Sequence, residues 1–576
     1  MHVDRIRRTV KGKTFESVLL RQSYRQDGKV KHRTLAHMTH WPAELVSVIE
    51  RTVRGEMLLP AGEAFSIARS WPHGHVAAVL GTARQMDLER LLDPKPSRQR
   101  DLVLAMIVAR VLQPASKLAT TRLWNSTSLA RTLGVEDATA DDLYAAMDWL
   151  LARQERIEQR LAKRHLEPGG VVLYDLSSTY LEGEHCPLAK RGHSRDGKPG
   201  QQQIEFGLLT NAVGEPVAIE VFPGNTGDPA TFMAQVAKVK DRFGVADVVW
   251  VGDRGMITGA QVRQLEEITG LSWITALRAP TIQQLLEAGS VQLSLFDTQN
   301  LAEVTDQRFP GERLILCHNP LLGEKRARKR EDMLQATEKE LAKVAAMVER
   351  GVAGGRAGLQ GAAKIGERVG RVVNKYAMAK HFVRTITDTS FSYERDEASI
   401  AEEAKLDGLY VIRTNVASQR LSTAEVVLAY KSLEEVEIAF RHFKLRDLEV
   451  RPVYHYLEDR VRAHLLLCML AYSVQRTMER ALAPLLFKDE AIPSRDDPVA
   501  PALRSAEAQR KEQTKLTAEG FPVHSFRTLL AQLATLVKNR VIPRGAGSEA
   551  AFDLTTQPSP LQTRAFALLG LGLKAM

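Results

Sequence analysis

Apolar and polar positions change their spacing several times along the chain, and each change predicts a different kind of structure. Two runs of alternating character flank Asp27-Gly28 in "SVLLRQSYRQDGKVKHRTLAH", which predicts a β-hairpin. From about residue 75 to 166, apolar residues recur every three or four positions, as in "DLVLAMIVARVL", which predicts helices, with Thr139 as one N-cap. The chain is therefore expected to begin with a small β unit followed by a helical domain.

A different pattern opens after Gly169-Gly170. The runs "VVLYDLSSTYLE", "QIEFGLLTN" and "PVAIEVFPG" predict three strands, followed by a helix with Asp228 as N-cap, a strand, a helix and a last strand. This is the element order of an RNase H-like α/β core. From Ala279 to about Asn415, strand-like pieces such as "SVQLSLFD" surround a charged helix and interrupt the core, which a long helix around Glu437 resumes. The expected fold class is α/β, an RNase H-like core with a strand-containing insertion subdomain.

These changes also predict the domain boundaries. We expect a small basic β unit over 1–60 and a helical domain, a candidate for DNA binding, over 70–166. The core is expected in two parts, over 167–279 and, with the Glu437 helix, over 416–485, separated by the insertion subdomain over 280–415. A C-terminal tail with helices, a candidate for oligomerisation, is expected over 486–576.

Composition narrows the class of protein. Lys and Arg (79) exceed Asp and Glu (69), and the net charge of +10 favours a polyanion partner, although a basic surface also serves solubility. The cysteines Cys186, Cys317 and Cys468 lie far apart and form no CxxC pair, so neither a disulfide framework nor a zinc site is indicated. The N-terminus is not a secretory signal, and the longest apolar run, Ala463 to Val474, is shorter than the roughly 18 residues of a membrane span. A cytoplasmic protein is expected.

Two acids lie at unusual places in the predicted strands. Asp175 follows "VVLY" within an apolar strand, where an unpaired carboxylate is costly unless that position faces solvent. Asp253 ends the strand "VVWVGD", at the kind of strand end where ligands of open α/β sheets collect. If the two strands are parallel neighbours, the carboxylates lie close together and either share a proton or hold a divalent cation.

A third acid comes from the long helix. With Val436, Phe440 and Phe443 on the apolar face, helical spacing places Glu437 in a narrow polar stripe beside that face, together with Tyr430, Arg441 and Lys444. Glu434 and Glu435 point elsewhere. A polar stripe at this position either faces a cleft or is a solvated edge with Glu–Arg and Glu–Lys pairs.

These residues resemble one family. Tyr430, Glu437 and Lys444 match the helix signature Y-(2)-R-(3)-E-(6)-K of a group of DDE transposases from bacterial insertion sequences, and Asp175 and Asp253 match the other two acids. The phrases "GHSRDGKPGQQQIEFGLL" and "FRHFKLRDLEVRPVYH" are also similar to that group, and the resemblance covers roughly residues 170 to 475. In one departure, Leu433 stands where the signature has arginine.

The resemblance implies that Asp175, Asp253 and Glu437 are catalytic and bind two divalent metal ions, with Mg²⁺ or Mn²⁺ favoured by oxygen-only ligands. Such ions activate the attacking oxygen and stabilise the leaving one in an in-line phosphoryl displacement. Tyr430 and Lys444 would contact DNA phosphates, and Arg441 is the candidate to replace the signature arginine. The implied activity is that of a transposase that binds the ends of an insertion sequence, cleaves a strand there and transfers it into target DNA.

The expected partners are double-stranded DNA at the transposon ends and the target, and a second copy of the chain in a homodimer on DNA, without a membrane. The expected location is the bacterial cytoplasm, at the nucleoid when DNA is bound. Two alternatives stay open, an RNase H-like nuclease without strand transfer and a catalytically inactive, transposase-derived DNA-binding protein. The remaining residues of interest are expected to serve packing or the surface, namely His442, His455 and His464, whose spacing fits no metal motif, and the core residues Trp250 and Trp273.

Overall fold

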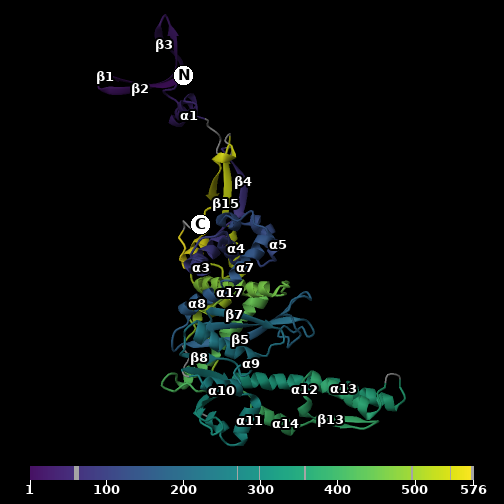
Figure 1. Cartoon of the computed structure of the whole chain (residues 1–576). Coiled ribbons are helices and arrows are strands. Elements are labelled where there is room, and N and C mark those ends of the chain that lie inside the picture. Colours follow the sequence, from purple (N-terminus) through teal and green to yellow (C-terminus); the bar gives the residue numbers. More distant parts are fainter. Residues whose placement is uncertain are drawn as a thin grey trace. The chain divides into compact units, whose positions relative to one another are not determined.

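The computed structural model describes residues 1–56, 64–268, 270–296, 299–355, 358–493, 497–544 and 547–572. Its contacts divide the chain into two compact units. The first unit consists of Met1–Pro72 and Leu536–Gln557, and the second of His73–Thr535 and Pro558–Met576. Figure 1 labels the elements of both units.

The first unit contains two small antiparallel sheets. One is formed by β1 (His2–Val10), β2 (Lys13–Gln26) and β3 (Lys29–His37), next to helix α1 (Ala43–Val53). The predicted hairpin is present, and Asp27 and Gly28 both have positive φ, 53° and 74°, as a two-residue turn of this kind requires. The other sheet is formed by β4 (Phe65–Pro72), β15 (Val537–Pro543) and β16 (Phe552–Thr555). The C-terminal region expected as tail and helices therefore also supplies strands.

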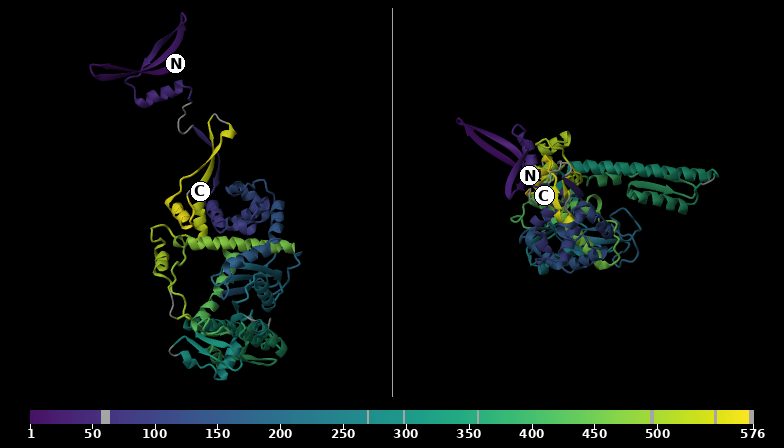
Figure 2. Two further views of the ribbon diagram at one scale, coloured as in Figure 1. Left: turned by 60° about the vertical axis from the view of Figure 1, so that its left-hand side comes forward. Right: turned by 90° about the horizontal axis from the view of Figure 1, so that it is seen from above.

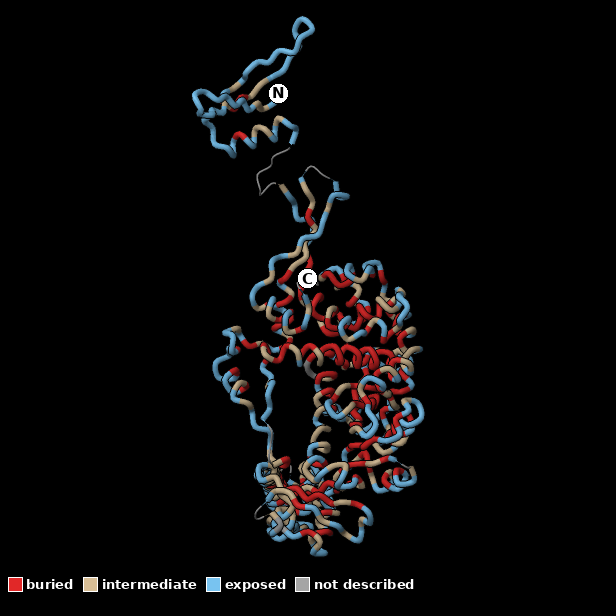
Figure 3. Tube along the Cα trace, turned by 90° about the vertical axis from the view of Figure 1, so that its left-hand side faces the viewer, coloured by how far each residue is buried: buried red, intermediate tan, exposed pale blue. Residues whose placement is uncertain are grey.

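A layer of helices opens the second unit. It consists of α2 (Gly74–Gln85), α3 (Leu88–Leu92), α4 (Arg98–Leu112), α5 (Lys117–Leu123), α6 (Leu129–Leu133), α7 (Ala140–Leu151) and α8 (Gln154–His165). Thr139 caps α7 as predicted, and it forms a capping box with Asp142. Helix α17 (Glu458–Ala481) contacts α2, α4 and α7 on one side and strand β7 (Pro216–Pro223) of the main sheet on the other. Since both sides are covered, α17 is buried along most of its length, as the red tube in Figure 3 shows.

Among the described residues, the main sheet has eight strands in the order β10-β11-β14-β9-β8-β5-β6-β7, of which β10 (Leu301–Val304), β11 (Arg313–His318) and β14 (Leu409–Thr414) come last along the chain. Its first five strands along the chain are β5 (Val171–Tyr180), β6 (Gln203–Asn211), β7 (Pro216–Pro223), β8 (Val248–Val251) and β9 (Leu271–Ala276). Strands β5, β8 and β9 are parallel neighbours, and the other pairs are antiparallel. Trp250 on β8 and Trp273 on β9 are fully buried, as expected of core residues. The result is a mixed α/β fold with one large mixed sheet.

Helices α9 (Asp228–Ala237) and α10 (Gly259–Glu266) precede and follow β8. Helix α9 begins at Asp228 with Gly227 as its N-cap, so the prediction that Asp228 caps the helix is wrong. Its carboxylate instead binds Arg195. Because Asp228 lies inside the first turn, its side chain is free to leave the helix end and reach another element.

The segment expected as a separate insertion is only partly separate from the sheet. Strands β10 (Leu301–Val304), β11 (Arg313–His318) and β14 (Leu409–Thr414) extend the main sheet beyond β9. The run "SVQLSLFD", expected as a strand, instead contains a 3-10 turn at Leu293–Phe296, because so short an apolar run does not distinguish the two. It follows α11 (Ala279–Glu287).

The remainder of that segment has a core of its own. The long helix α12 (Pro320–Val352) packs against α13 (Ala362–Lys375), and the hairpin of β12 (Phe382–Ile386) and β13 (Phe391–Arg395) and α14 (Glu397–Ala404) follow. A cluster that includes Leu341, Ile365 and Phe382 is buried among them. The right view of Figure 2 shows α12 as a long teal helix.

The helix expected around Glu437 is divided. Helix α15 (Thr423–Lys431) ends before Ser432, α16 (Leu433–Arg441) begins after it, and a π-helical turn at His442–Arg446 follows. The chain continues after α17 with α18 (Ala506–Thr514), α19 (Phe526–Ala534) and α20 (Pro560–Leu568). Among the described residues no single helix has the length and apolar character of a membrane span. One pair of helical segments, Arg98–Leu112 and Lys117–Ser126, has that length and apolar character only when the two are taken together, and the pair is bent by 88°.

Candidate active site

The parallel pairing of β5 and β8 brings two of the predicted acids to the same level. Leu173 lies opposite Val251, and the same register carried two residues further aligns Asp175 with Asp253. Asp253 is fixed by its own turn, since its Oδ1 accepts hydrogen bonds from the backbone N–H of Gly255 and of Met256, each at 2.8 Å. Its second oxygen makes neither of these bonds. The two carboxylates therefore leave neighbouring strands at one end of the sheet.

Packing of α16 sets the direction of Glu437. Val436 is fully buried, and the Phe440 ring meets the Phe206 ring of β6 edge to face at 5.4 Å. With this face against the sheet, Glu437 lies on the exposed side of the helix and borders the cleft described next. Glu435 points another way and pairs with Arg476 of α17 at 2.6 Å. The predicted apolar face is thus present on α16, which carries Glu437 and Arg441 of the predicted polar stripe, whereas Tyr430 lies on α15 and Lys444 in the π-helical turn.

A cleft of about 570 Å³ contains all three predicted acids. Its lining also includes two further acids, Asp196 and Asp228, and several cations. The full lining is Asp175, Leu176, Ser177, Arg195, Asp196, Asp228, Asp253, Glu437, Phe440, Arg441, Lys444 and Arg451. Residues from β5, α9 and α16, from the turn after β8, from the loop between β5 and β6 and from the segment after α16 therefore converge in one place.

The five acids of the cleft differ in their partners. Asp196 binds Lys444 at 3.1 Å and Arg451 at 2.8 Å, and Asp228 binds Arg195 at 2.5 Å. Among the described residues, Asp175, Asp253 and Glu437 take part in no ion pair. The three acids predicted from the sequence are therefore the ones that no side-chain cation of the described residues neutralises by contact.

The electrostatics of the cleft agree with this arrangement. Burial and the neighbouring Asp253 carboxylate raise the pKa of Asp175 to about 7. Burial, together with the charge of Asp253, raises the pKa of Tyr430 to about 12, which places this phenol near the acids although it does not line the cleft. Three carboxylates with no cation in contact among the described residues offer the oxygen donors that a hard divalent metal ion prefers.

The predicted DNA contacts occupy different environments. Lys444 lines the cleft in the π-helical turn, and burial lowers its pKa, although Asp196 opposes that change. Arg441 lines the same cleft from the exposed side of α16. The four predicted contact and signature positions, Tyr430, Leu433, Arg441 and Lys444, thus lie on one stretch of helix, with a break at Ser432.

Sequence reasoning missed Arg195, Asp196, Asp228 and Arg451 as parts of the cleft. Arg195 and Asp196 belong to the phrase "GHSRDGKPG", which carried part of the family resemblance without any assigned role. That phrase was the available signal for these two residues. Asp228 gave none, because an acid before Pro229 at a helix start is expected on helix-capping grounds alone.

His442, Asp447 and Glu479 form a separate buried group whose ligand atoms lie within 4.8 Å of one another. His442 Nδ1 lies 2.6 Å from Asp447 Oδ2, Gln475 donates to Glu479 Oε1 at 2.7 Å, and Lys488 also binds Glu479. These partners satisfy the group within the chain, which accords with the packing role expected for His442.

Comparison with known proteins places the chain in a family. Residues 3–58 match the model of the IS1634 family transposase N-terminal domain, and residues 170–474 match the transposase DDE domain. No curated protein matches the chain. Among solved structures, a cryo-EM structure of a piggyBac transposase synaptic complex with hairpin DNA shares 10% identity, and the alignment covers 77% of this chain and 88% of that one. The TM-score of that alignment is 0.25.

The DDE match covers more than half of the chain and spans all the elements that carry the three acids. The N-terminal match covers β1, β2, β3 and α1. The chain therefore belongs to the DDE transposases, metal-dependent enzymes that act on DNA, and its N-terminal region is that of the IS1634 type.

Proposed function

We propose that Asp175, Asp253 and Glu437 are the catalytic, metal-binding residues of this transposase. The observation that carries the proposal is the difference among the five acids of the cleft, of which these three alone have no cation in contact among the described residues. A cluster of unpaired carboxylates is unfavourable without a cation, so a bound cation removes the repulsion among them.

The donor set favours Mg²⁺ or Mn²⁺, because every ligand is a carboxylate oxygen. Two such ions, when bound, supply Lewis-acid activation of the attacking oxygen and charge stabilisation of the leaving one. Asp253 is held for this task by two backbone N–H groups, which fix one oxygen and leave the other available. Asp175 is held by the N–H of Leu176 at 2.8 Å.

The activity proposed is strand cleavage at the ends of an insertion sequence, followed by transfer of the freed 3′-hydroxyl into target DNA. Lys444 and Tyr430 are proposed to contact phosphates close to the cut, and Arg441 to contact the DNA backbone beside the cleft. The order β5, β6, β7, α9, β8, α10 and β9 supports an RNase H-like core with the insertion placed before the Glu437 helix.

The proposed partner is double-stranded DNA. Two copies of the chain are proposed to bind it as a homodimer, at the nucleoid of the bacterial cytoplasm. The basic sheet of the first unit supports this partner, since its cations Arg5, Arg7, Arg8, Lys11, Lys13, Arg21, Arg25, Lys29, Lys31 and Arg33 outnumber its acids Asp4, Glu16 and Asp27. An RNase H-like nuclease without strand transfer is the second candidate, because the same three acids serve hydrolysis alone.

The test compares Glu437→Gln with Glu434→Gln in the full-length protein. Glu437→Gln keeps the side-chain shape but removes the charge, so Mg²⁺-dependent cleavage of DNA carrying the element's own ends should fall by about three orders of magnitude. End binding should persist. Glu434 is exposed on the same helix but does not line the cleft, so Glu434→Gln should cleave normally. Normal cleavage by Glu437→Gln would show that α16 does not supply the third acid.

A target plasmid in the same reaction separates the two activities. Joined products from the unaltered protein indicate strand transfer, and cleaved ends without joined products favour the nuclease.

A further inference from the structure

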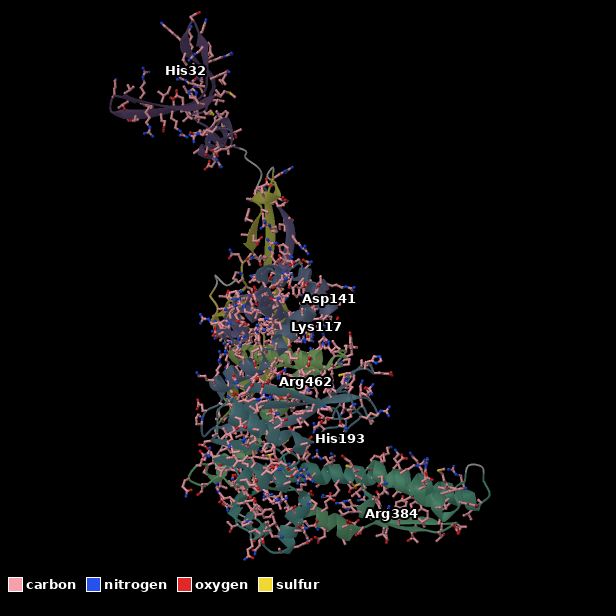
Figure 4. The ribbon with its side chains drawn as sticks, in the orientation of Figure 1. His32, Lys117, Asp141, His193, Arg384 and Arg462 are labelled. Carbon is pink, nitrogen blue, oxygen red and sulfur yellow. The ribbon has the colours of Figure 1, made fainter. Side chains whose placement is uncertain are left out.

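Arg195 is a cation of the cleft to which the family signature gives no role. It lies in the loop between β5 and β6, where its backbone N–H donates to Ser178 Oγ of β5 at 3.1 Å. Its side chain lines the same cleft as the three acids, and its charge opposes the burial that raises the pKa of Asp175. Figure 4 labels His193, two residues earlier in this loop. Arg195 is therefore attached to the strand that carries the first acid.

Two carboxylates of unequal exposure hold the guanidinium. Arg195 Nη1 donates to Glu205 Oε2 at 2.8 Å, and Nη2 donates to Asp228 Oδ1 at 2.5 Å. The Glu205 side chain is 5% exposed and the Asp228 side chain 28% exposed. The bond to the buried Glu205 orients the planar guanidinium. The bond to the more exposed Asp228 lies where a molecule that enters the cleft can compete for Nη2.

The signature position that carries an arginine in the family supplies no cation to this cleft. Leu433 carries no charge at the position of the signature arginine. Lys444 and Arg451 are both committed to Asp196, whose side chain is only 3% exposed. Among the cations that line the cleft, Arg195 combines a fixed orientation with a bond that opens toward solvent.

We propose that Arg195 is a catalytic residue that binds the scissile phosphate in place of the arginine missing at Leu433. On DNA binding, Nη2 leaves Asp228 for a non-bridging phosphate oxygen, and Nη1 stays on Glu205. A guanidinium held in this way donates charge-assisted hydrogen bonds to the phosphate without being reorganised during the reaction. This inference rests on the proposed function, because it takes the reaction at the three acids as given.

Single-turnover cleavage at saturating protein tests the proposal with Arg195→Ala and Arg195→Lys. Loss of one preorganised donor should lower the cleavage rate by about 100- to 1000-fold in Arg195→Ala, while the Kd for the transposon end changes less than about threefold. Arg195→Lys keeps the positive charge but loses the planar guanidinium with its paired donors, so its cleavage rate should fall by about tenfold, less than that of Arg195→Ala. The matched control is Arg242→Ala, because Arg242 forms an exposed ion pair with Glu155 outside the cleft. This substitution should change neither the cleavage rate nor the Kd for the transposon end.

A triple variant separates phosphate binding from a structural role. If Arg195 only neutralised Glu205 and Asp228, then Arg195→Ala combined with Glu205→Gln and Asp228→Asn would remove all three charges and restore cleavage, which would overturn the proposal. We expect the triple variant to stay at least as slow as Arg195→Ala. Cleavage by Arg195→Ala within threefold of the unaltered rate, with Glu437→Gln inactive, would reject this inference and leave the proposed function standing. Normal cleavage by Glu437→Gln would instead reject the proposed function.

Discussion

Lys117, at the first turn of α5, is a buried lysine with which no acid of the described residues pairs. Its Nζ lies 3.5 Å from His455 Nε2 and 3.4 Å from His464 Nδ1, and its side chain is 4% exposed. Figure 4 labels it within the helical layer. Burial, with a contribution from Arg110, lowers the pKa of Lys117 to about 7. His455 and His464 are thus packing residues, as expected, and they serve as neighbours of a lysine that loses its proton easily.

This environment predicts a pH dependence of stability. Between pH 7 and 10.5 the unfolded chain binds a proton at Lys117 that the folded chain has released, so the free energy of unfolding should rise with pH in this window. Relative to Lys117→Met, the unaltered protein should gain about 1–3 kcal/mol from pH 7 to pH 10.5, at no more than about 1.4 kcal/mol per pH unit. Denaturant unfolding of both proteins across that range measures the difference. Parallel curves would contradict the prediction.

At the scale of elements, the pairing of β5 with β6 depends on a glycine. Gly207 lies opposite Leu176, and a Cβ at this position would lie 2.1 Å from the Tyr174 hydroxyl oxygen and 2.6 Å from its ring carbon Cζ. Tyr174 is fully buried one residue before Asp175, so the ring has little room to move. The glycine is required here by close approach of two strands, and the position of the first acid depends on it.

Gly207→Ala should therefore destabilise the second unit by about 2 kcal/mol or more, and lower cleavage in proportion to any displacement of Asp175. The matched control is Gly366→Ala on α13, where an added Cβ meets nothing within 4 Å. Because alanine is the better helix former, Gly366→Ala should leave stability unchanged or raise it by about 0.5–1 kcal/mol. Thermal unfolding followed by circular dichroism compares the two. Equal changes in thermal stability for the two substitutions would show that the contact with Tyr174 does not require glycine at position 207.

At the scale of the whole molecule, the first unit carries its own small core and a concentrated positive charge. Val18, Met38 and Val46 are buried together, and most of β1, β2 and β3 is exposed, as the pale blue tube in Figure 3 shows. On β3, Lys29, Lys31 and Arg33 alternate with other residues and so share one face. A β-ribbon with cations along one face suits the phosphate backbone of duplex DNA.

Removal of Lys31 should weaken end binding in a salt-dependent way. The variant Lys31→Ala should lower the slope of log K against log salt concentration by about 0.9, the loss of one phosphate contact, and leave Mg²⁺-dependent cleavage at saturating protein unchanged. Lys405→Ala is the control, because Lys405 is an exposed lysine of α14 paired with Glu402. Binding titrations at four or more salt concentrations provide the slopes. An unchanged slope for Lys31→Ala would exclude this face of β3 from the DNA contact.

Local sequence determined much of the architecture. The Asp27-Gly28 turn, the Thr139 cap, the strands that carry Asp175 and Asp253, and the apolar face of α16 all depend on neighbours close along the chain, and all are present in the structure. The spacing of apolar residues and the residue types that favour turns are local properties, so they can be predicted from the sequence. The order of the three acids and their family resemblance were available for the same reason.

Only the tertiary structure decided which charges meet. Five acids border one cleft. In the part of the chain that the structure describes, Asp196 and Asp228 have cations in contact and the other three acids do not, and the sequence does not predict this difference because the partners come from distant segments. The same holds for β10, β11 and β14, whose runs predict strands but not the sheet that they join. Strand pairing and ion pairing are contacts between residues far apart in sequence, and they are fixed by the packing of the whole unit rather than by local pattern.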